Sequence, residues 1–375
     1  MDTIKRKIAV ILSMVLMLTS IPVWNKPVYA EIVPPIVDEE TGNELENHDA
    51  EFVEGEVIVC VKESGVGSLK HGYSQDDDLI MHDKGAHNAL SMLIGAEDLM
   101  NVTDAVRESE ELSVITQAGD ENVISIDKSA PEDEYTLKFV QSDEYSTDQM
   151  IDMFENVPGV LYAEPNYIYH LMDDELSKID APALDDLPPS LDGSTEKKAD
   201  HTSLQYAYGN GPGGMDVPDW NIEGHINASG SVIAILDTGV DYNHEDLKDV
   251  MWDDGLKYPE LTALGGGKYG YNAVPKHSDG TPYMTDDPMD EQGHGTHCSG
   301  SAGAPWNGYG VSGTANGAEI MAVKVGGDDR RLLDSSILRG FNYITEAKKA
   351  GVNVVAVNNS WVGPVESCSV ALAVK

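Results

Sequence analysis

The stretch Ser231-Val-Ile-Ala-Ile-Leu-Asp237-Thr-Gly-Val-Asp241 decides the fold. Five consecutive apolar residues, 232–236, lead directly into an aspartate. A short apolar run rich in β-branched residues predicts a strand that is buried on both faces, as in a parallel sheet. Asp237 would then lie at the carboxyl end of the strand, where open α/β sheets bind their ligands. The alternative is an aspartate that caps a turn or a helix.

A histidine motif follows downstream, Asp290-Glu-Gln-Gly-His294-Gly-Thr-His297-Cys-Ser-Gly300. Together with Asp237-Thr-Gly, it resembles two of the three active-site signatures of the subtilisin-like serine proteases, the subtilases. The resemblance implies that Asp237 orients His294, and that His294 acts as general base towards a serine. The alternative is a histidine that caps a helix. His297 is expected to be structural, and Cys298 to be a small buried residue rather than a nucleophile or a ligand.

Two further apolar runs, residues 317–325 and 352–357, predict buried strands, and residues 335–350 have the apolar spacing of a helix. Alternating strands and helices indicate an α/β fold with a parallel, doubly wound sheet. The resemblance implies that this is the N-terminal half of a subtilisin-like sheet. The acidic run at residues 286–290 is predicted to be a solvated loop.

A smaller α+β module is predicted upstream. Residues 135–139 and 160–169 are strand candidates, and Ser146-Thr-Asp-Gln149 has the capping-box pattern of a helix start. Pro158-Gly-Val and Ala-Glu-Pro-Asn-Tyr167 resemble the end of a subtilase propeptide. This resemblance implies a ferredoxin-like inhibitor and folding module that begins near residue 55. Residues 55–62 are a further strand candidate, and between residues 63 and 130 the pattern indicates only a helix within residues 87–101.

Composition divides the chain into four parts. Residues 1–30 have the basic start, apolar run and small final residue of a cleaved signal peptide, which predicts a secreted, extracellular protein; a retained membrane anchor is the alternative. Residues 31–171 are the predicted propeptide. Residues 172–200 have linker composition, and residues 201–375 are the predicted N-terminal part of a catalytic domain.

The chain is strongly acidic, with a net charge of −41, and 42 of its 65 acidic residues lie between residues 31 and 200. Such a charge excludes nucleic acid as an expected partner. It is interpreted as a solubilising surface rather than an acidic binding tail. The three cysteines do not form a disulfide framework.

The resemblance also implies substrate and metal sites. Asn358-Asn-Ser360-Trp361-Val-Gly363 is similar to the subtilase segment whose backbone pairs with an extended peptide, which makes Ser360, Trp361 and Gly363 candidate substrate-binding residues. A plain strand-to-loop turn is the alternative. Asp246 and Asn307 lie where subtilases bind a structural calcium, and Gln205 offers a further oxygen. An ordinary surface loop is the alternative here.

The third active-site signature, Gly-Thr-Ser, occurs nowhere in the 375 residues, and the family's oxyanion-hole asparagine is absent as well. The chain is therefore predicted to be a secreted serine endopeptidase precursor that is truncated before its serine and inactive as written. Its expected partners are polypeptide substrates and its own propeptide. The alternative is a non-catalytic binding protein that keeps both parts as an interaction module.

Overall fold

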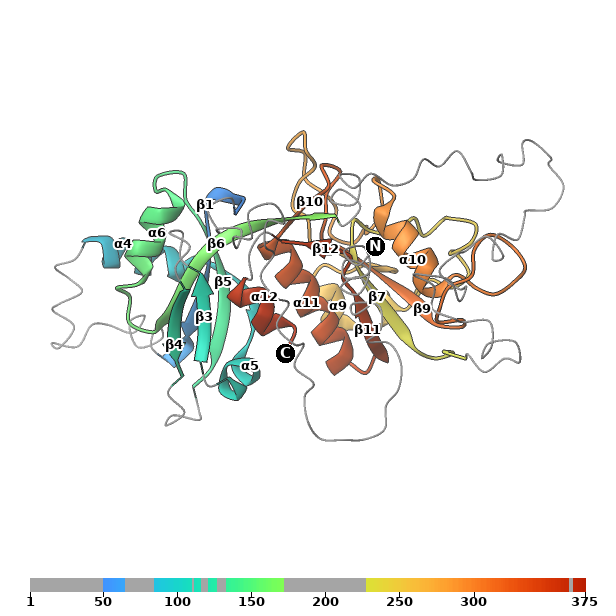
Figure 1. The fold of residues 1–375 in the computed structure, drawn as a ribbon, viewed down its shortest axis with the longest axis horizontal. Coiled ribbons are helices and arrows are strands. Elements are labelled where there is room, and N and C mark those ends of the chain that lie inside the picture. The colour runs from blue at the N-terminus through green and yellow to red at the C-terminus, as the bar shows by residue number, and fades with distance from the viewer. Residues whose placement is uncertain are drawn as a thin grey trace, which may run out of the picture.

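The computed structural model describes residues 50–64, 84–109, 111–115, 121–126, 133–171, 227–363 and 367–375. They form two units, residues 50–171 and residues 227–375, which lie side by side (Figure 1). The predicted signal peptide and linker, residues 1–30 and 172–200, lie outside the described residues. Within the described ranges, no helix is long and apolar enough to cross a membrane.

The first unit is built on an antiparallel sheet with the strand order β6-β1-β5-β2. Its elements are β1 (Phe52–Lys62), α4 (Lys84–Ile94), β2 (Glu97–Asn101), β5 (Tyr135–Gln141), α6 (Thr147–Phe154) and β6 (Val160–Leu171). Alternate side chains of a strand point to opposite faces of the sheet. Val57 and Val59 therefore pack in the core that holds residues of α4 and α6, whereas Ile58 and Cys60 join the core shared with the second unit.

Some of the local predictions for this unit are confirmed and others are wrong. The capping box begins α6 as predicted, because Ser146 accepts from the Gln149 backbone and Gln149 accepts from the Ser146 backbone. The helix expected within residues 87–101 is wrong in its second half, since α4 ends at Ile94 and Leu99 lies in β2. Pairing with β5 holds that segment extended. The residues between β2 and β5 also form α5 (Thr103–Glu108) and the hairpin of β3 (Glu111–Ile115) and β4 (Glu121–Ser125).

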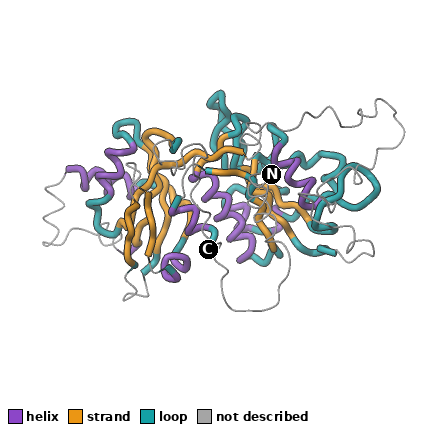
Figure 2. The backbone as a smooth tube through the Cα atoms, viewed as in Figure 1, coloured by secondary structure: helices purple, strands orange, loops and turns teal. Residues whose placement is uncertain are grey.

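A parallel sheet with the strand order β11-β7-β9-β8 organises the second unit, and helices cover both of its faces (Figure 2). The elements are β7 (Val232–Asp237), β8 (Gly270–Asn272), β9 (Glu319–Lys324), β11 (Val354–Asn358), α10 (His294–Gly303) and α11 (Asp334–Lys349). The predicted strand at 232–236 is confirmed as β7, which is buried along its whole length. Ile233 and Ile235 pack in the core on the α10 side, and Ala234 and Leu236 pack on the α11 side.

Two predictions about the second unit need correction. The run at residues 352–357 was expected to be buried on both faces, but β11 pairs only with β7 at the edge of the sheet, and Val355 is 56% exposed. The glycine-rich, polar composition of residues 251–290 predicts a surface excursion, but part of this segment is folded into the core. It forms η6 (Gly255–Lys257) and α9 (Pro259–Ala263), and Leu261 is buried in the core.

The two units are joined by β6, which runs from one into the other (Figure 1). Its first part pairs with β1, while its last four residues lie antiparallel to β10 (Arg331–Leu333) and β12 (Trp361–Val362). The helix α12 (Cys368–Ala373) ends the chain against the same junction, where it contacts β3 and α5. The junction between the units is therefore formed by backbone pairing and by a continuous apolar core.

Candidate active site

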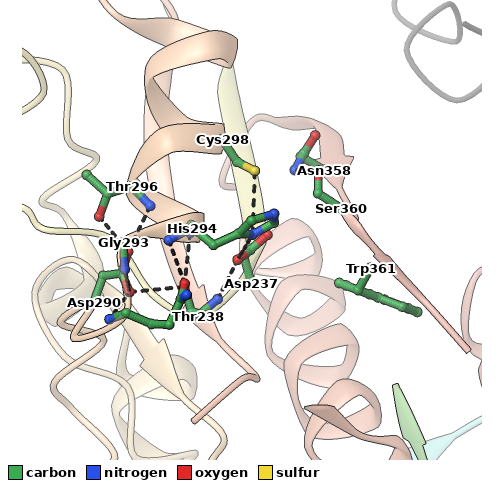
Figure 3. Close-up of polar contacts among 12 residues, drawn as sticks. Asp237, Thr238, Asp290, Gly293, His294, Thr296, Cys298, Asn358, Ser360 and Trp361 are labelled. Carbon is green, nitrogen blue, oxygen red and sulfur yellow. Dashed lines mark hydrogen bonds and ion pairs between the residues drawn. The ribbon is translucent and has the colours of Figure 1, made fainter. Parts of the chain in front are cut away.

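Asp237 and His294, predicted from two separate motifs, are in direct contact (Figure 3). Asp237 is the last residue of β7 and is fully buried, and His294 is the first residue of α10. The His294 Nδ1 atom lies 2.7 Å from Asp237 Oδ1, and the same oxygen accepts the Thr238 backbone N–H at 2.7 Å. This is the geometry of a base histidine whose tautomer is set by a buried carboxylate.

Glycines on both sides of His294 allow this contact. Gly293 is the N-cap residue of α10 and has φ 103°, a left-handed conformation that favours glycine. At Gly295, a Cβ atom would lie 2.1 Å from the Gly239 carbonyl oxygen, so a larger residue would push α10 away from the end of β7. The small residues of the motif therefore let the histidine helix approach the aspartate strand.

Asp290 is a site residue that the sequence analysis missed, because the acidic run at 286–290 was expected to be a solvated loop. Its carboxylate is half-buried and accepts five hydrogen bonds, from the Thr238 hydroxyl, the backbone N–H groups of Gln292, Gly293 and Thr296, and the Thr296 hydroxyl. Burial alone would raise the pKa of Asp290, but the hydrogen-bond donors outweigh burial, and the pKa lies below its ordinary value. Asp290 thereby ties the start of α10 to the residue after Asp237. Its place three residues before Gly293, ahead of a helix start, was the available signal.

Two further residues support the same strand end. Lys324 is fully buried at the end of β9, and its Nζ donates to the Thr238 carbonyl at 2.7 Å. Burial lowers the pKa of Lys324, although nearby acids including Asp290 oppose this shift. On the other side of β7, Trp361 Nε1 donates to the Leu236 carbonyl at 3.0 Å. The backbone around Asp237 is therefore held by strands on both sides.

Cys298 lies one helical turn after His294 and is half-buried rather than buried as expected. Its Sγ is 3.8 Å from His294 Nδ1, the ring nitrogen that faces Asp237. Among the described residues, Asp237, His294 and Cys298 form the one group of three whose spacing would suit a metal ion. The thiol is on the Nδ1 side, so it is not placed to lose its proton to Nε2. His297 lies on the exposed face of α10.

The charge state of His294 gives a first prediction. Burial lowers the pKa of His294, but the hydrogen bond with Asp237, helped by Cys298, outweighs burial and raises the pKa to about 10. Because the pKa is raised, the pair stabilises the fold fully below about pH 6.5, and this contribution is lost as the pH rises through about 10. Asp237→Asn should bring the His294 pKa down by several units. Histidine-selective NMR titration measures the His294 pKa, and His294→Ala identifies the His294 signal. An unchanged His294 pKa in Asp237→Asn would contradict the conclusion that Asp237 raises it.

The candidate substrate-binding residues lie where β6 meets the second unit. Trp361 and Val362 pair with Leu171 and His170 of β6. The Trp361 ring meets the Tyr169 ring edge-on at 5.1 Å, and a Cβ on Gly363 would lie 2.3 Å from that ring. Ser360 is farther from β6 and accepts from the Asn358 side chain at 2.9 Å. The segment 360–363 thus borders an extended strand of the same chain.

The candidate calcium residues lie near one loop. Asp246 is 5% exposed, and its Oδ2 accepts from the Val311 backbone at 2.8 Å, while no hydrogen-bond partner of Oδ1 is found in the described part of the chain. A buried carboxylate oxygen of this kind suits a hard cation. The Asn307 side-chain oxygen accepts from the Tyr309 backbone at 2.9 Å in the same loop. Gln205 lies outside the described residues.

Comparison with known proteins agrees with the motifs. Residues 228–373 match the model of the subtilase family. Subtilisin BL of Lederbergia lenta is 34% identical over 150 residues, which are 40% of this chain and 44% of that protein. Thermitase of Thermoactinomyces vulgaris is 32% identical over 159 residues, 42% of this chain and 45% of that protein. The structure of fervidolysin from Fervidobacterium pennivorans, a keratinolytic enzyme related to subtilisin, aligns with a TM-score of 0.44 and 17% identity over 87% of this chain and 38% of that one. The chain thus spans less than half the length of each of these relatives.

Proposed function

We propose, from the premise that residues 228–373 form a domain of the subtilase family, that this chain is part of the precursor of a secreted serine endopeptidase. The contact of His294 Nδ1 with Asp237 Oδ1 at 2.7 Å is the observation that carries the proposal. When His294 is neutral, this contact keeps its proton on Nδ1 and leaves Nε2 as the nitrogen that would accept a proton from a serine. The substrates would be polypeptides.

The roles of the two residues follow from their positions. Asp237 accepts the Nδ1 proton, fixes the tautomer of His294 and stabilises the imidazolium that forms during attack on a peptide carbonyl. His294 takes the proton of the serine and then gives it to the leaving amine. The serine and the oxyanion-hole asparagine are not among the 375 residues, so they would lie in a longer product of the same gene.

Residues 50–171 would be the inhibitory and folding module of the precursor. The order β6-β1-β5-β2, with α4 between β1 and β2 and α6 between β5 and β6, supports a ferredoxin-like topology for it. The end of β6 would occupy the groove in which an extended substrate pairs with β10 and β12. Trp361 and Gly363 would contact the substrate side chain that takes the place of Tyr169, with Ser360 at the end of the groove.

The contacts of β6 with the starts of two helices support the proposed folding role of residues 50–171. Glu164 accepts from the Ser367 hydroxyl and from the backbone N–H groups of Cys368 and Ser369, at 2.8–3.1 Å, at the start of α12. Asn166 accepts from the Ser335 backbone at 2.9 Å at the start of α11. Such groups satisfy N–H donors that a helix leaves without internal partners. The module would thus stabilise both helices, which is a physical basis for assisted folding.

A salt bridge between the two units would fix their relative orientation. Arg339 of α11 donates to both carboxylate oxygens of Glu97 in β2, at 2.6 and 2.7 Å. Its guanidinium also lies 5.4 Å from the centre of the Phe139 ring. Two parallel hydrogen bonds fix the angle between a guanidinium and a carboxylate. This contact is partly exposed, so it would set the docking geometry more than the affinity.

A non-catalytic binding protein is the second candidate function. The extensive junction between the units favours it, because β6 already pairs with β10 and β12. The coding sequence beyond codon 375 distinguishes the two candidate functions. A reading frame that continues past codon 375 into a Gly-Thr-Ser motif supports the endopeptidase, and a natural stop codon without such a motif supports the binding protein.

Calcium would bind beside Asp246, with the Asn307 amide oxygen and loop carbonyls as further ligands, and would stabilise the loop that follows α10. A ligand that binds only the folded state raises the unfolding temperature. Calcium should therefore raise the unfolding temperature by several degrees relative to excess chelator, and Asp246→Asn should abolish this difference. Asp249→Asn, an exposed carboxyl nearby, is the matched control. Equal calcium responses of the wild type and Asp246→Asn would exclude this site.

A further inference from the structure

Two buried carboxyl groups lie at the junction of the two units. Glu164 comes from β6 and is 1% exposed, and Asp334 is the first residue of α11 and is fully buried. We call these two residues the carboxyl pair. Glu164 and Asn166 point to the same face of β6, and Asn166 is bonded to Ser335, the residue after Asp334, which brings the two carboxyls together. Glu164 accordingly raises the pKa of Asp334. A buried carboxylate is unfavourable unless donors or a cation compensate its charge.

The hydrogen bonds of ordinary geometry at the junction go to Glu164, whereas the Ser367 and Tyr169 hydroxyls and the Tyr167 backbone N–H lie near enough to Asp334 to lower its pKa without satisfying either oxygen. Glu164 accepts three hydrogen bonds at the start of α12, where the helix dipole also favours a negative charge. Neither carboxylate oxygen of Asp334 has a hydrogen bond of ordinary geometry within the described residues. The backbone N–H of Ser335, next to Asp334 in α11, donates to Asn166 instead. Burial raises the pKa of both carboxyls, but the hydrogen bonds at the start of α12 support ionisation of Glu164 better than ionisation of Asp334 is supported.

The groups that face the pair are neutral or acidic. Tyr167 and Tyr169 of β6 interact electrostatically with both carboxyls, and the Ser367 hydroxyl faces both. Tyr162 of β6, Cys60 of β1 and Cys368 of α12 lie around Glu164. No lysine, arginine or histidine of the described ranges forms an ion pair with either carboxyl. Two negative charges without a cation repel each other strongly in a buried place.

We propose that Asp334 holds a proton while β6 is docked, and that the carboxyl pair makes the junction between the two units loosen as the pH rises. The direction of the Asp334 pKa agrees, since burial and then Glu164 raise it well above its ordinary value. When β6 separates from α11, Asp334 meets water and ionises. A group whose pKa is raised in the docked state stabilises docking at low pH, and this stabilisation is lost as the pH rises above about 4.

The size of the effect follows from the proton count. Between the ordinary pKa of Asp334 and its raised value, the opening equilibrium should shift about tenfold towards the open form for each pH unit, because opening releases one proton. Glu56 of β1 shifts the equilibrium in the same direction, since burial raises its pKa. However, Glu56 faces Arg339, Lys276 and Arg331 and accepts from Asn166, so its charge is partly compensated. Comparison with an Asp334 variant isolates the contribution of the carboxyl pair.

The consequence for regulation rests on the proposed function: if residues 50–171 inhibit a protease, alkaline conditions would favour release of the inhibitor. The experiment does not depend on that function. Amide hydrogen exchange of β6 is measured in the full chain from about pH 5 to about pH 8, for the wild type and Asp334→Asn at matched pH. The ratio of wild-type to variant exchange rates should rise with pH, by up to about tenfold per pH unit while the pH lies below the raised pKa of Asp334. Asp249→Asn, the same change at an exposed site, should keep the wild-type dependence.

A ratio that stays within about twofold over this range would overturn the proposal. Asp334→Ser, which is smaller and also neutral, replaces the first variant if Asp334→Asn does not fold. Infrared spectroscopy gives an independent reading, because a protonated carboxyl has a carbonyl band that a carboxylate lacks. At about pH 5, above the ordinary pKa of an aspartate, that band should be stronger in the wild type than in the Asp334 variant, and equal bands in the two proteins would also overturn the proposal. These readouts can fail while the protease proposal stands, and they can succeed while it falls.

Discussion

Purified residues 31–375 should hydrolyse a fluorogenic peptide no faster than His294→Ala prepared in the same way. Asp237 and His294 can orient and activate a nucleophile, but neither forms the acyl intermediate of this mechanism. In subtilisin, loss of the serine alone lowers turnover by about a million-fold, and loss of one oxyanion donor lowers it by about 10²–10³ when measured alone. These losses do not simply add, because the groups act as a unit.

A serine-directed phosphonate provides the control for this expectation. It should neither label the chain nor change the residual signal, whereas a related active protease in parallel should be labelled. Phosphonate-sensitive hydrolysis that His294→Ala abolishes would contradict the prediction. Such a result would mean that one of the serines present is a nucleophile.

Glu164→Ala should destabilise the full chain by about 3 kcal/mol at neutral pH. The substitution leaves the Ser367 hydroxyl and two backbone N–H groups at the start of α12 without their acceptor in a buried place. A buried donor without a partner costs about 1–3 kcal/mol, and relaxation of the junction recovers part of the sum. Denaturant unfolding measures the change, and hydrogen exchange should show faster opening of α12 than of β7.

Two further variants separate charge from packing at this position. Glu164→Gln keeps the size of the side chain and one acceptor oxygen, so its loss should be smaller than that of Glu164→Ala. Glu144→Ala removes an exposed carboxyl from the same unit and should change the stability by less than about 0.5 kcal/mol. Equal effects of Glu164→Ala and Glu144→Ala would show that the contacts of β6 with α12 do not hold the junction together.

The sequence was most informative where function depends on local pattern. A strand such as 232–236 is recognisable because burial on both faces requires an unbroken apolar run, and Asp237 then marks its carboxyl end. The contact of Asp237 with His294 could be expected because each residue lies in a short motif that resembles a subtilase signature. The start of α6 was predictable for the same reason, since a capping box is complete within four residues.

The features that the sequence did not reveal depend on distant partners. The edge position of β11 follows from the strand order, and an apolar edge strand has the same pattern as a central one. Leu90, Leu93 and Ile94 have helical spacing, and the predicted helix was extended beyond them to Leu99, but pairing with β5 made the segment of Leu99 a strand. Asp290 resembled the other acids of its loop, and only the folded chain brings Thr238 and the start of α10 to its carboxylate.

The proposal that this chain belongs to a serine endopeptidase precursor is tested most directly on the native gene product. A biotinylated serine-directed phosphonate is added to the culture medium of the organism that makes the protein, and captured proteins are identified by peptide mass spectrometry. The proposal predicts capture of a polypeptide that contains peptides from residues 227–375 and carries the label on the serine of a Gly-Thr-Ser motif. Recovery of these peptides from the medium only in a protein that the phosphonate never labels, with no such motif in its sequence, would contradict the proposal.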